Sequence, residues 1–160
     1  MTTSEDATLV LSKLVQMACG LGLRIVRRSQ YVSDFRSEDG LDNYEFSYIP
    51  FGHAYVDIEL SNLLEEDDRP HWAHIVAACA QANQHCKNVF VVPVGGHQVA
   101  VKTAIPLAQF NRLNIADIYD RMAELHDGAA IFIRKLADIE MEESDSTSPA
   151  FMIEPPEQLQ

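Results

Sequence analysis

The sequence lacks most of the features that identify a secreted, membrane-bound or metal-binding protein. It has 3 cysteines, an odd number, and contains neither paired Cys-X-X-Cys spacings nor a His-Glu-X-X-His motif. A disulfide framework and the common zinc sites are therefore not indicated. No apolar run approaches the length of a membrane span, and the N-terminal segment is polar and acidic, unlike a signal peptide. We expect a cytoplasmic protein with reduced cysteines.

Basic residues are also scarce. The chain has 12 Lys and Arg against 24 Asp and Glu, a formal charge of −12. Such a surface repels phosphate backbones and anionic lipids, so we expect neither nucleic acid nor a membrane as a partner. The exception is a local basic cluster formed by Arg24, Arg27 and Arg28. This cluster could dock an acidic partner or the chain's own acidic tail, or it could be a solvated surface.

The 160 residues suit one domain. We expect residues 1–140 to form it, because residues 141–160 are rich in Glu, Ser and Pro, which is typical of a disordered tail. The tail has one apolar cluster, Phe151-Met152-Ile153. That cluster is either a short recognition motif or an apolar spot without a role.

The clearest pattern is one long amphipathic helix from Asn114 to about Met141. Its apolar residues recur at alternating steps of three and four, at Ile115, Ile118, Met122, Leu125, Ala129, Phe132, Leu136 and Ile139. Asn114 is a good N-cap, and Asp117 suits the positive end of the helix. Gly128, followed by two alanines, indicates close approach of another backbone, because glycine inside a helix costs about 1 kcal/mol relative to alanine.

The rest of the chain alternates helical and extended patterns. We predict a helix over Thr3–Leu21, one bent strand over Leu23–Arg36, strands over Tyr44–Ile49 and His53–Leu60, a helix over Asp68–Lys87, and strands over Asn88–Val94 and His97–Ile105. Asp68 is the expected cap of the second helix, and Gly95-Gly96 the expected two-residue turn. This order predicts an α+β fold: helix, three-stranded meander, helix, β-hairpin and long C-terminal helix, with a mainly antiparallel sheet.

Candidate chemistry is weak. His71 and His74 lie in the first turn of the second helix and could share a metal, but no third ligand is evident, and exposed histidines are the simpler interpretation. Cys79 and Cys86 are about 10 Å apart along the helix, which is too far to share an ion. We therefore interpret both as core residues. Asp57 and Glu59 could act as an acid–base pair or belong to a solvated sheet face. We assign no catalytic, cofactor-binding or metal-binding residue, and we expect no cofactor.

The run from Ile75 to Leu107, IVAACAQANQHCKNVFVVPVGGHQVAVKTAIPL, joins a helix ending in Asn83 to a hairpin that finishes in a hydrophobic-Pro-hydrophobic step. With the predicted element order, it resembles the fold shared by class I type III secretion chaperones and YbjN-type proteins, over roughly Thr8 to Glu140. The resemblance implies a small, acidic, non-enzymatic cytosolic protein, commonly a homodimer, that holds a partner polypeptide. It transfers no catalytic or binding residue.

We therefore expect a chaperone-like or regulatory protein-binding module, acting as a homodimer on a client of unknown identity. The expected partner or dimer surface lies on the long helix, at Ile118, Met122, Gly128, Ala129, Phe132 and Leu136. One alternative is a small-molecule-binding protein or enzyme with a cleft between the sheet and this helix. Another is an immunity-type inhibitor that blocks a basic protein with its acidic surface.

Overall fold

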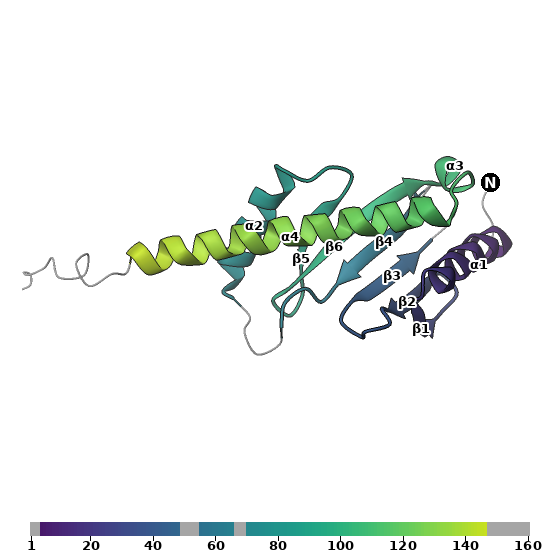
Figure 1. Cartoon of the computed structure of the whole chain (residues 1–160), viewed down its shortest axis with the longest axis horizontal. Helices are drawn as coiled ribbons and strands as arrows, with labels where there is room; N and C mark the ends of the chain where they lie inside the picture. Colours follow the sequence, from purple (N-terminus) through teal and green to yellow (C-terminus); the bar gives the residue numbers. More distant parts are fainter. Residues whose placement is uncertain (1–3, 49–54, 66–69, 147–160) are drawn as a thin grey trace, which may run out of the picture.

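The computed structural model describes residues 4–48, 55–65 and 70–146 (Figure 1). The helices are α1 (Ser4–Gly20), α2 (Trp72–Asn83), α3 (Leu107–Phe110) and α4 (Ile115–Ser146). The strands are β1 (Arg24–Arg28), β2 (Val32–Arg36), β3 (Asn43–Ser47), β4 (Tyr55–Ser61), β5 (Phe90–Val94) and β6 (Gln98–Pro106). The strands form one sheet in the order β1-β2-β3-β4-β6-β5, and every neighbouring pair is antiparallel. The predicted α+β class is confirmed.

The meander has four strands rather than the three we predicted. The segment expected as one bent strand is a hairpin, because the backbone N–H of Ser29 donates to the carbonyl of Val32 at 2.8 Å and reverses the chain. Ile25 then lies opposite Phe35, and a bulge between Ile25 and Arg27 shifts the register. The extra turn makes β1 a separate strand at one edge of the sheet.

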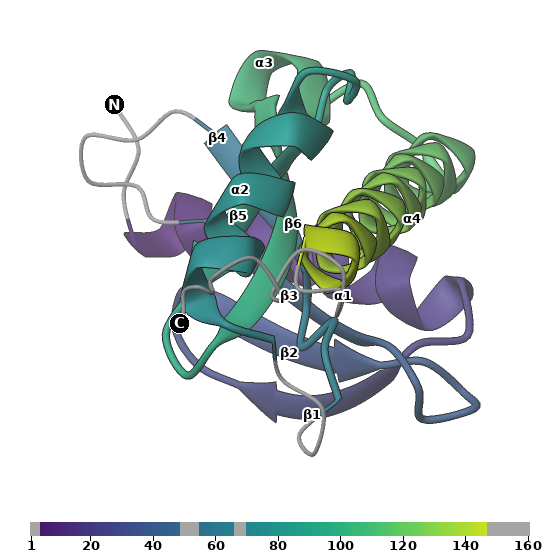
Figure 2. The ribbon, with the colours of Figure 1, turned by 90° about the vertical axis from the view of Figure 1, so that its left-hand side faces the viewer.

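The helices cover one face of this sheet. Figure 1 shows α4 running along the molecule, with α2 beside its C-terminal half and α1 near β1 to β3. Figure 2 shows α2 and α4 together on the same side of the curved sheet, and α1 contacts both α4 and the first three strands. One core joins these layers and includes Leu14, Phe46, Ile58, Leu125 and Phe132. The opposite face of the sheet carries alternate, partly exposed side chains.

Helix α4 begins where the sequence predicts. The Asn114 side chain accepts from the N–H of Asp117 at 3.1 Å, and the Asp117 carboxylate accepts from the N–H of Asn114 at 2.9 Å. This reciprocal pair is a capping box. The predicted end near Met141 is wrong, because the helix continues to Ser146 and Glu143 contacts His74 of α2. The domain boundary at residue 140 therefore falls inside α4, and the cluster Phe151, Met152 and Ile153 lies outside the described residues.

Two other predicted boundaries need correction. Helix α2 is shorter than Asp68–Lys87: its N-cap is His71, and Asp68 lies outside the described residues. The extended backbone of His71, with ψ 143°, keeps the helix from starting earlier. The turn between β5 and β6 has three residues rather than two, because His97 joins Gly96 in the positive-φ region and Val94 pairs with Gln98.

Candidate functional site

The two edges of the sheet differ in how their backbone groups are satisfied. At the β5 edge, the Asn83 side chain accepts from the N–H of Val91 and donates to its carbonyl, both at 2.8 Å. Two strand positions further on is Pro93, which has no N–H to donate. An amide from α2 and a proline therefore occupy the positions where another strand would pair with β5.

The β1 edge has no comparable cover among the described residues. All five residues of β1 are exposed, and the apolar Ile25 and Val26 are 42% and 52% exposed. Arg27 pairs with Asp34 of β2 at 2.9 Å, and Arg28 donates to the Ser12 hydroxyl of α1 at 3.3 Å. These contacts hold β1 in place while leaving its outer side accessible. The Arg24, Arg27 and Arg28 cluster seen in the sequence is thus part of an exposed sheet edge.

A row of charges crosses the uncovered face of the sheet next to this edge. In register, Arg27 is followed by Asp34, Glu45, Glu59 and Lys102 on successive strands. Arg27 and Lys102 form ion pairs with the outer carboxylates, the Lys102–Glu59 distance being 3.2 Å. Burial, together with the charges of Glu59 and Asp34, raises the pKa of Glu45 in the middle. Glu59 is thus a member of this row, and Asp57 pairs in register with Ser47 and Ala104.

Beside the row, the face has a hollow of about 280 Å³. Its lining combines residues of β1, β2 and β3 with the end of β4, and includes Val26, Arg36, Asn43 and Ser61. The Arg36 side chain donates to the Asn43 amide oxygen at 3.2 Å. Sequence reasoning missed Glu45 and Arg36, because their importance comes from the cross-strand register rather than from any local motif.

The residues predicted on α4 as a partner surface are mostly inside the protein. Ile118, Met122, Phe132 and Leu136 are buried in the core, and Ala129 packs against it. Their side chains already contact this chain's own sheet and α2, so a partner would reach them only after rearrangement. That they bind a partner stays a prediction.

Gly128 marks a close approach, as predicted, although side chains rather than a backbone make it. A Cβ at this position would lie 3.1 Å from Val101 Cγ1 and from Val89 Cγ2, and 3.7 Å from Cys86 Sγ. The missing side chain therefore lets α4 pack onto β6 and the segment before β5. The glycine serves packing within one chain.

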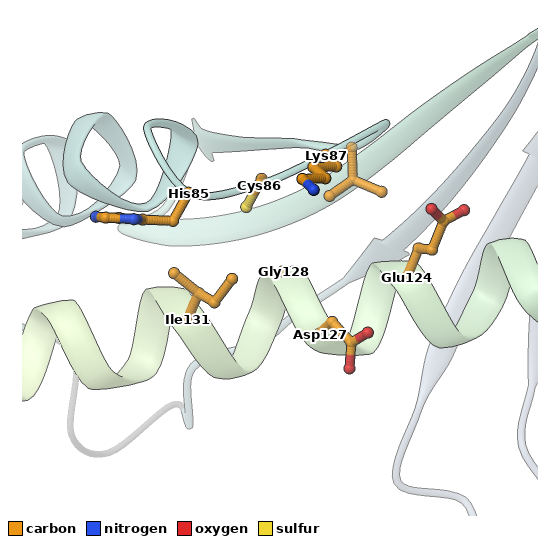
Figure 3. Close-up of a pocket in the computed structure, with 8 residues that line it drawn as sticks. His85, Cys86, Lys87, Glu124, Asp127, Gly128 and Ile131 are labelled. Carbon is orange, nitrogen blue, oxygen red and sulfur yellow. The ribbon is translucent and has the colours of Figure 1, made fainter.

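A cavity of about 290 Å³ opens beside Gly128, between α4 and the segment after α2 (Figure 3). Apolar Val89 and Ile131 line it together with charged groups, and Figure 3 shows Glu124 reaching up from α4 toward the segment that carries Lys87. The Glu124 carboxylate already accepts from Asn88 at 3.0 Å. Burial raises the pKa of the Cys86 thiol, so Cys86 is not an activated nucleophile. The cavity can hold a small molecule but contains no catalytic arrangement.

The other candidates also lack catalytic geometry. Burial raises the pKa of the Cys79 thiol to about 11, as expected for a core cysteine. The rings of His71 and His74 meet edge to face with centroids 5.5 Å apart, and His74 pairs with Glu143. In the part of the chain that the structure describes, no three His, Cys, Asp or Glu residues are grouped to hold a metal ion.

One polar contact could not be predicted from any local sequence pattern. The Tyr44 hydroxyl shares a hydrogen bond with Nε2 of His126, 82 residues away on α4, and Asp42 lies 3.7 Å from the same nitrogen. Burial, followed by the charges of Asp42 and Asp39, raises the pKa of Tyr44. The contact ties α4 to the start of β3, so we interpret it as structural.

This α+β arrangement is similar to that of a solved structure. A chain of the solved "Structure of the HopA1-SchA Chaperone-Effector Complex" superposes with a TM-score of 0.53 at 11% identity, covering 81% of this chain and 96% of that chain. No family model and no curated protein matches the sequence. The resemblance is thereby confirmed for the fold, while its YbjN-type part stays a prediction. Among the described residues, no helix has the length and apolar character that crossing a bilayer requires.

Proposed function

We propose that this protein is a non-enzymatic, chaperone-like module that binds an extended segment of a partner polypeptide as an added strand along β1. The observation that carries the proposal is the difference between the two sheet edges. Asn83 and Pro93 occupy the β5 edge, whereas the β1 edge is exposed along its whole length. An exposed edge is a template for strand addition, in which main-chain hydrogen bonds give affinity and side chains give specificity.

Apolar contact adds to these hydrogen bonds. Ile25 and Val26 are large apolar residues left partly exposed on β1, and a strand laid beside them removes part of that surface from water. Each main-chain hydrogen bond adds a net of about 1 kcal/mol. The fold likeness supports the same kind of function, because the similar structure is described as a chaperone–effector complex. That this chain binds a client polypeptide is itself part of the proposal.

The proposal includes a homodimer in the cytoplasm. The dimer rests on the resemblance to the secretion chaperones, and the location rests on the composition of the sequence. Cell fractionation tests the location. Light scattering tests the oligomeric state.

The deciding experiment has two stages. Tagged full-length protein is used to capture partners from the native cytoplasm, and mass spectrometry identifies them. Hydrogen–deuterium exchange on the purified complex then locates the contact. We expect slower exchange at the amides of β1 and little change at β5, because Asn83 already occupies that edge. Slower exchange confined to α4 or to the strands that carry Asp34, Glu45 and Glu59, with β1 unchanged, would contradict strand addition.

A second function is favoured by one observation, the cavity beside Gly128. Its mixture of apolar and charged lining suits a small polar ligand. A thermal-shift screen of metabolites tests this alternative. A ligand that raises the melting temperature of the protein but not that of an Ile131→Trp variant, in which the cavity is filled, would support it over the chaperone-like function.

A further inference from the structure

Arginine is concentrated at the β1 edge far beyond its share of the chain. Arg24, Arg27 and Arg28 lie within the five residues of β1, and Arg36 lies directly opposite Arg24 on β2. The chain has only 12 Lys and Arg against 24 Asp and Glu. The open edge is therefore a basic patch on an acidic protein.

The register divides these arginines between the two faces. Phe35 and Ser33 of β2 are buried on the helix-covered face, so Arg36 and its partner Arg24 lie on the uncovered face. Arg27, paired with Asp34, lies on that face as well. Arg28 is opposite Ser33 and contacts Ser12 of α1. A strand added beside β1 would thus place alternate side chains next to Arg24 and Arg27.

Two of these guanidinium groups have no charge partner within the described residues. Like charges directly opposite each other on neighbouring strands are destabilising, and Arg24 and Arg36 are such a pair. Arg36 is held by the neutral Asn43 amide, and no ion pair joins either arginine to a described carboxylate. A carboxylate placed beside them would relieve this repulsion, and guanidinium groups bind carboxylates in a two-pronged geometry.

We propose that the segment bound along β1 is acidic, with Asp or Glu at the alternate positions that face Arg24 and Arg27. This inference rests on the proposed function, since it names the chemistry of the client at the same edge. The local arginines dominate over the net negative charge of the protein because charges further away than about 8 Å are largely screened at physiological salt.

The same arginines argue against other occupants. A second copy of this chain pairing through β1 would set arginine against arginine, which makes self-pairing at this edge unfavourable. Nucleic acid and anionic lipid carry no peptide main chain, so they cannot complete a β-sheet and would leave the backbone groups of β1 without strand partners. An acidic peptide satisfies both the charges and the backbone of β1.

The test uses three synthetic peptides of nine residues that alternate valine or threonine with glutamate, glutamine or lysine. Fluorescence anisotropy measures their binding to the full-length protein at low and at physiological salt. We expect the glutamate peptide to bind roughly threefold to tenfold more tightly than the glutamine peptide, and the lysine peptide most weakly. Added salt should narrow these differences.

Two variants with the same change in charge locate the effect. In Arg24→Glu, an exposed residue changes sign, and the preference for the glutamate peptide should disappear or reverse in favour of the lysine peptide. Arg134→Glu, at an exposed position on α4, should keep the wild-type preference. Thermal melts of both variants establish that each is folded. Equal effects of the two variants would show that net charge, and not the β1 edge, sets the preference.

The outcomes separate this inference from the function on which it rests. If the three peptides bind equally and slow the exchange of the β1 amides, the acidic preference is wrong and strand addition stands. If neither the peptides nor a captured client protects β1, both proposals fail. Binding of anionic vesicles or a DNA oligonucleotide that depends on Arg24, without binding of any peptide, would replace the peptide by a phosphate-bearing partner.

Discussion

Glu45 is a residue whose charge the fold disfavours. It lies between Asp34 and Glu59 in the row of charges on the uncovered sheet face, while the cations of the row pair with the outer carboxylates. Its folded-state pKa is raised by burial first and by these neighbours second. A raised pKa means that the folded state binds the proton more tightly than the unfolded state does. The charge on Glu45 therefore lowers stability above the folded pKa, and this penalty fades as the pH falls through it.

We predict that Glu45→Gln stabilises the protein at neutral pH, by roughly 0.5 kcal/mol, because the glutamine removes a partly buried charge and its like-charge repulsion while keeping the shape. Urea unfolding at pH 7 and near pH 4 measures the difference. The gain should shrink at the lower pH, where the wild-type carboxyl becomes protonated. A destabilised variant at pH 7 would mean that Glu45 has a favourable partner. Glu124→Gln, at a carboxylate that accepts from Asn88, is the matched control and should not stabilise.

Gly128 gives a second prediction at this scale. Replacing an exposed helical glycine by alanine normally stabilises by about 1 kcal/mol. Here the new methyl group would lie 3.1 Å from two branched valine side chains, so we expect Gly128→Ala to lose that gain, and Gly128→Leu to destabilise by roughly 2 kcal/mol through overpacking. Thermal or urea unfolding measures both. A Gly128→Ala variant that gains the full 1 kcal/mol would show that Val89 and Val101 move aside easily.

At the scale of elements, the sequence predicted features that depend on one segment but did not predict contacts between segments. The cap at Asn114 and the apolar stripe from Ile118 to Leu136 follow from local spacing, and both are present. The separate strand β1, the pairing of Glu45 with Glu59 and the contact from Tyr44 to His126 depend on register and on residues distant in sequence. No local propensity encodes those contacts, so the open edge could not be recognised from the sequence.

The closure of β5 by α2 is an element-scale contact that can be tested. Asn83→Ala removes two hydrogen bonds and leaves the Val91 N–H and carbonyl without their partner, so we expect a loss of roughly 1–3 kcal/mol. It should also raise the tendency to aggregate, because a second edge becomes available. Denaturant unfolding and light scattering during storage measure these effects. Gln84→Ala, at the exposed C-cap of the same helix, is the control and should change little.

At the scale of the whole molecule, the oligomeric state is the first quantity to measure. The α4 residues that we predicted as a dimer surface are mainly buried, so an exposed face is the more accessible interface. Trp72 and Val76 are exposed apolar residues one turn apart on α2, and tryptophan is a frequent anchor of interfaces.

We predict a dimer by light scattering at micromolar concentration, and a monomer for Trp72→Glu. Tyr119→Glu, at an exposed aromatic on α4, is the control and should remain a dimer. A wild-type mass equal to one chain across this concentration range would contradict the prediction. A Trp72→Glu variant that stays dimeric would place the interface elsewhere.

The difference between the two sheet edges also bears on how many strands each chain can bind. A sheet that can be extended on both sides can join copies or clients into a growing chain, as in fibrils. Under the proposed strand addition, Asn83 occupies the β5 edge and β1 is exposed, so each copy would offer one edge to a foreign strand. The expected stoichiometry is therefore one segment bound directly to each chain. Under the proposed strand addition, the covered β5 edge would keep each copy from extending its sheet on the second side.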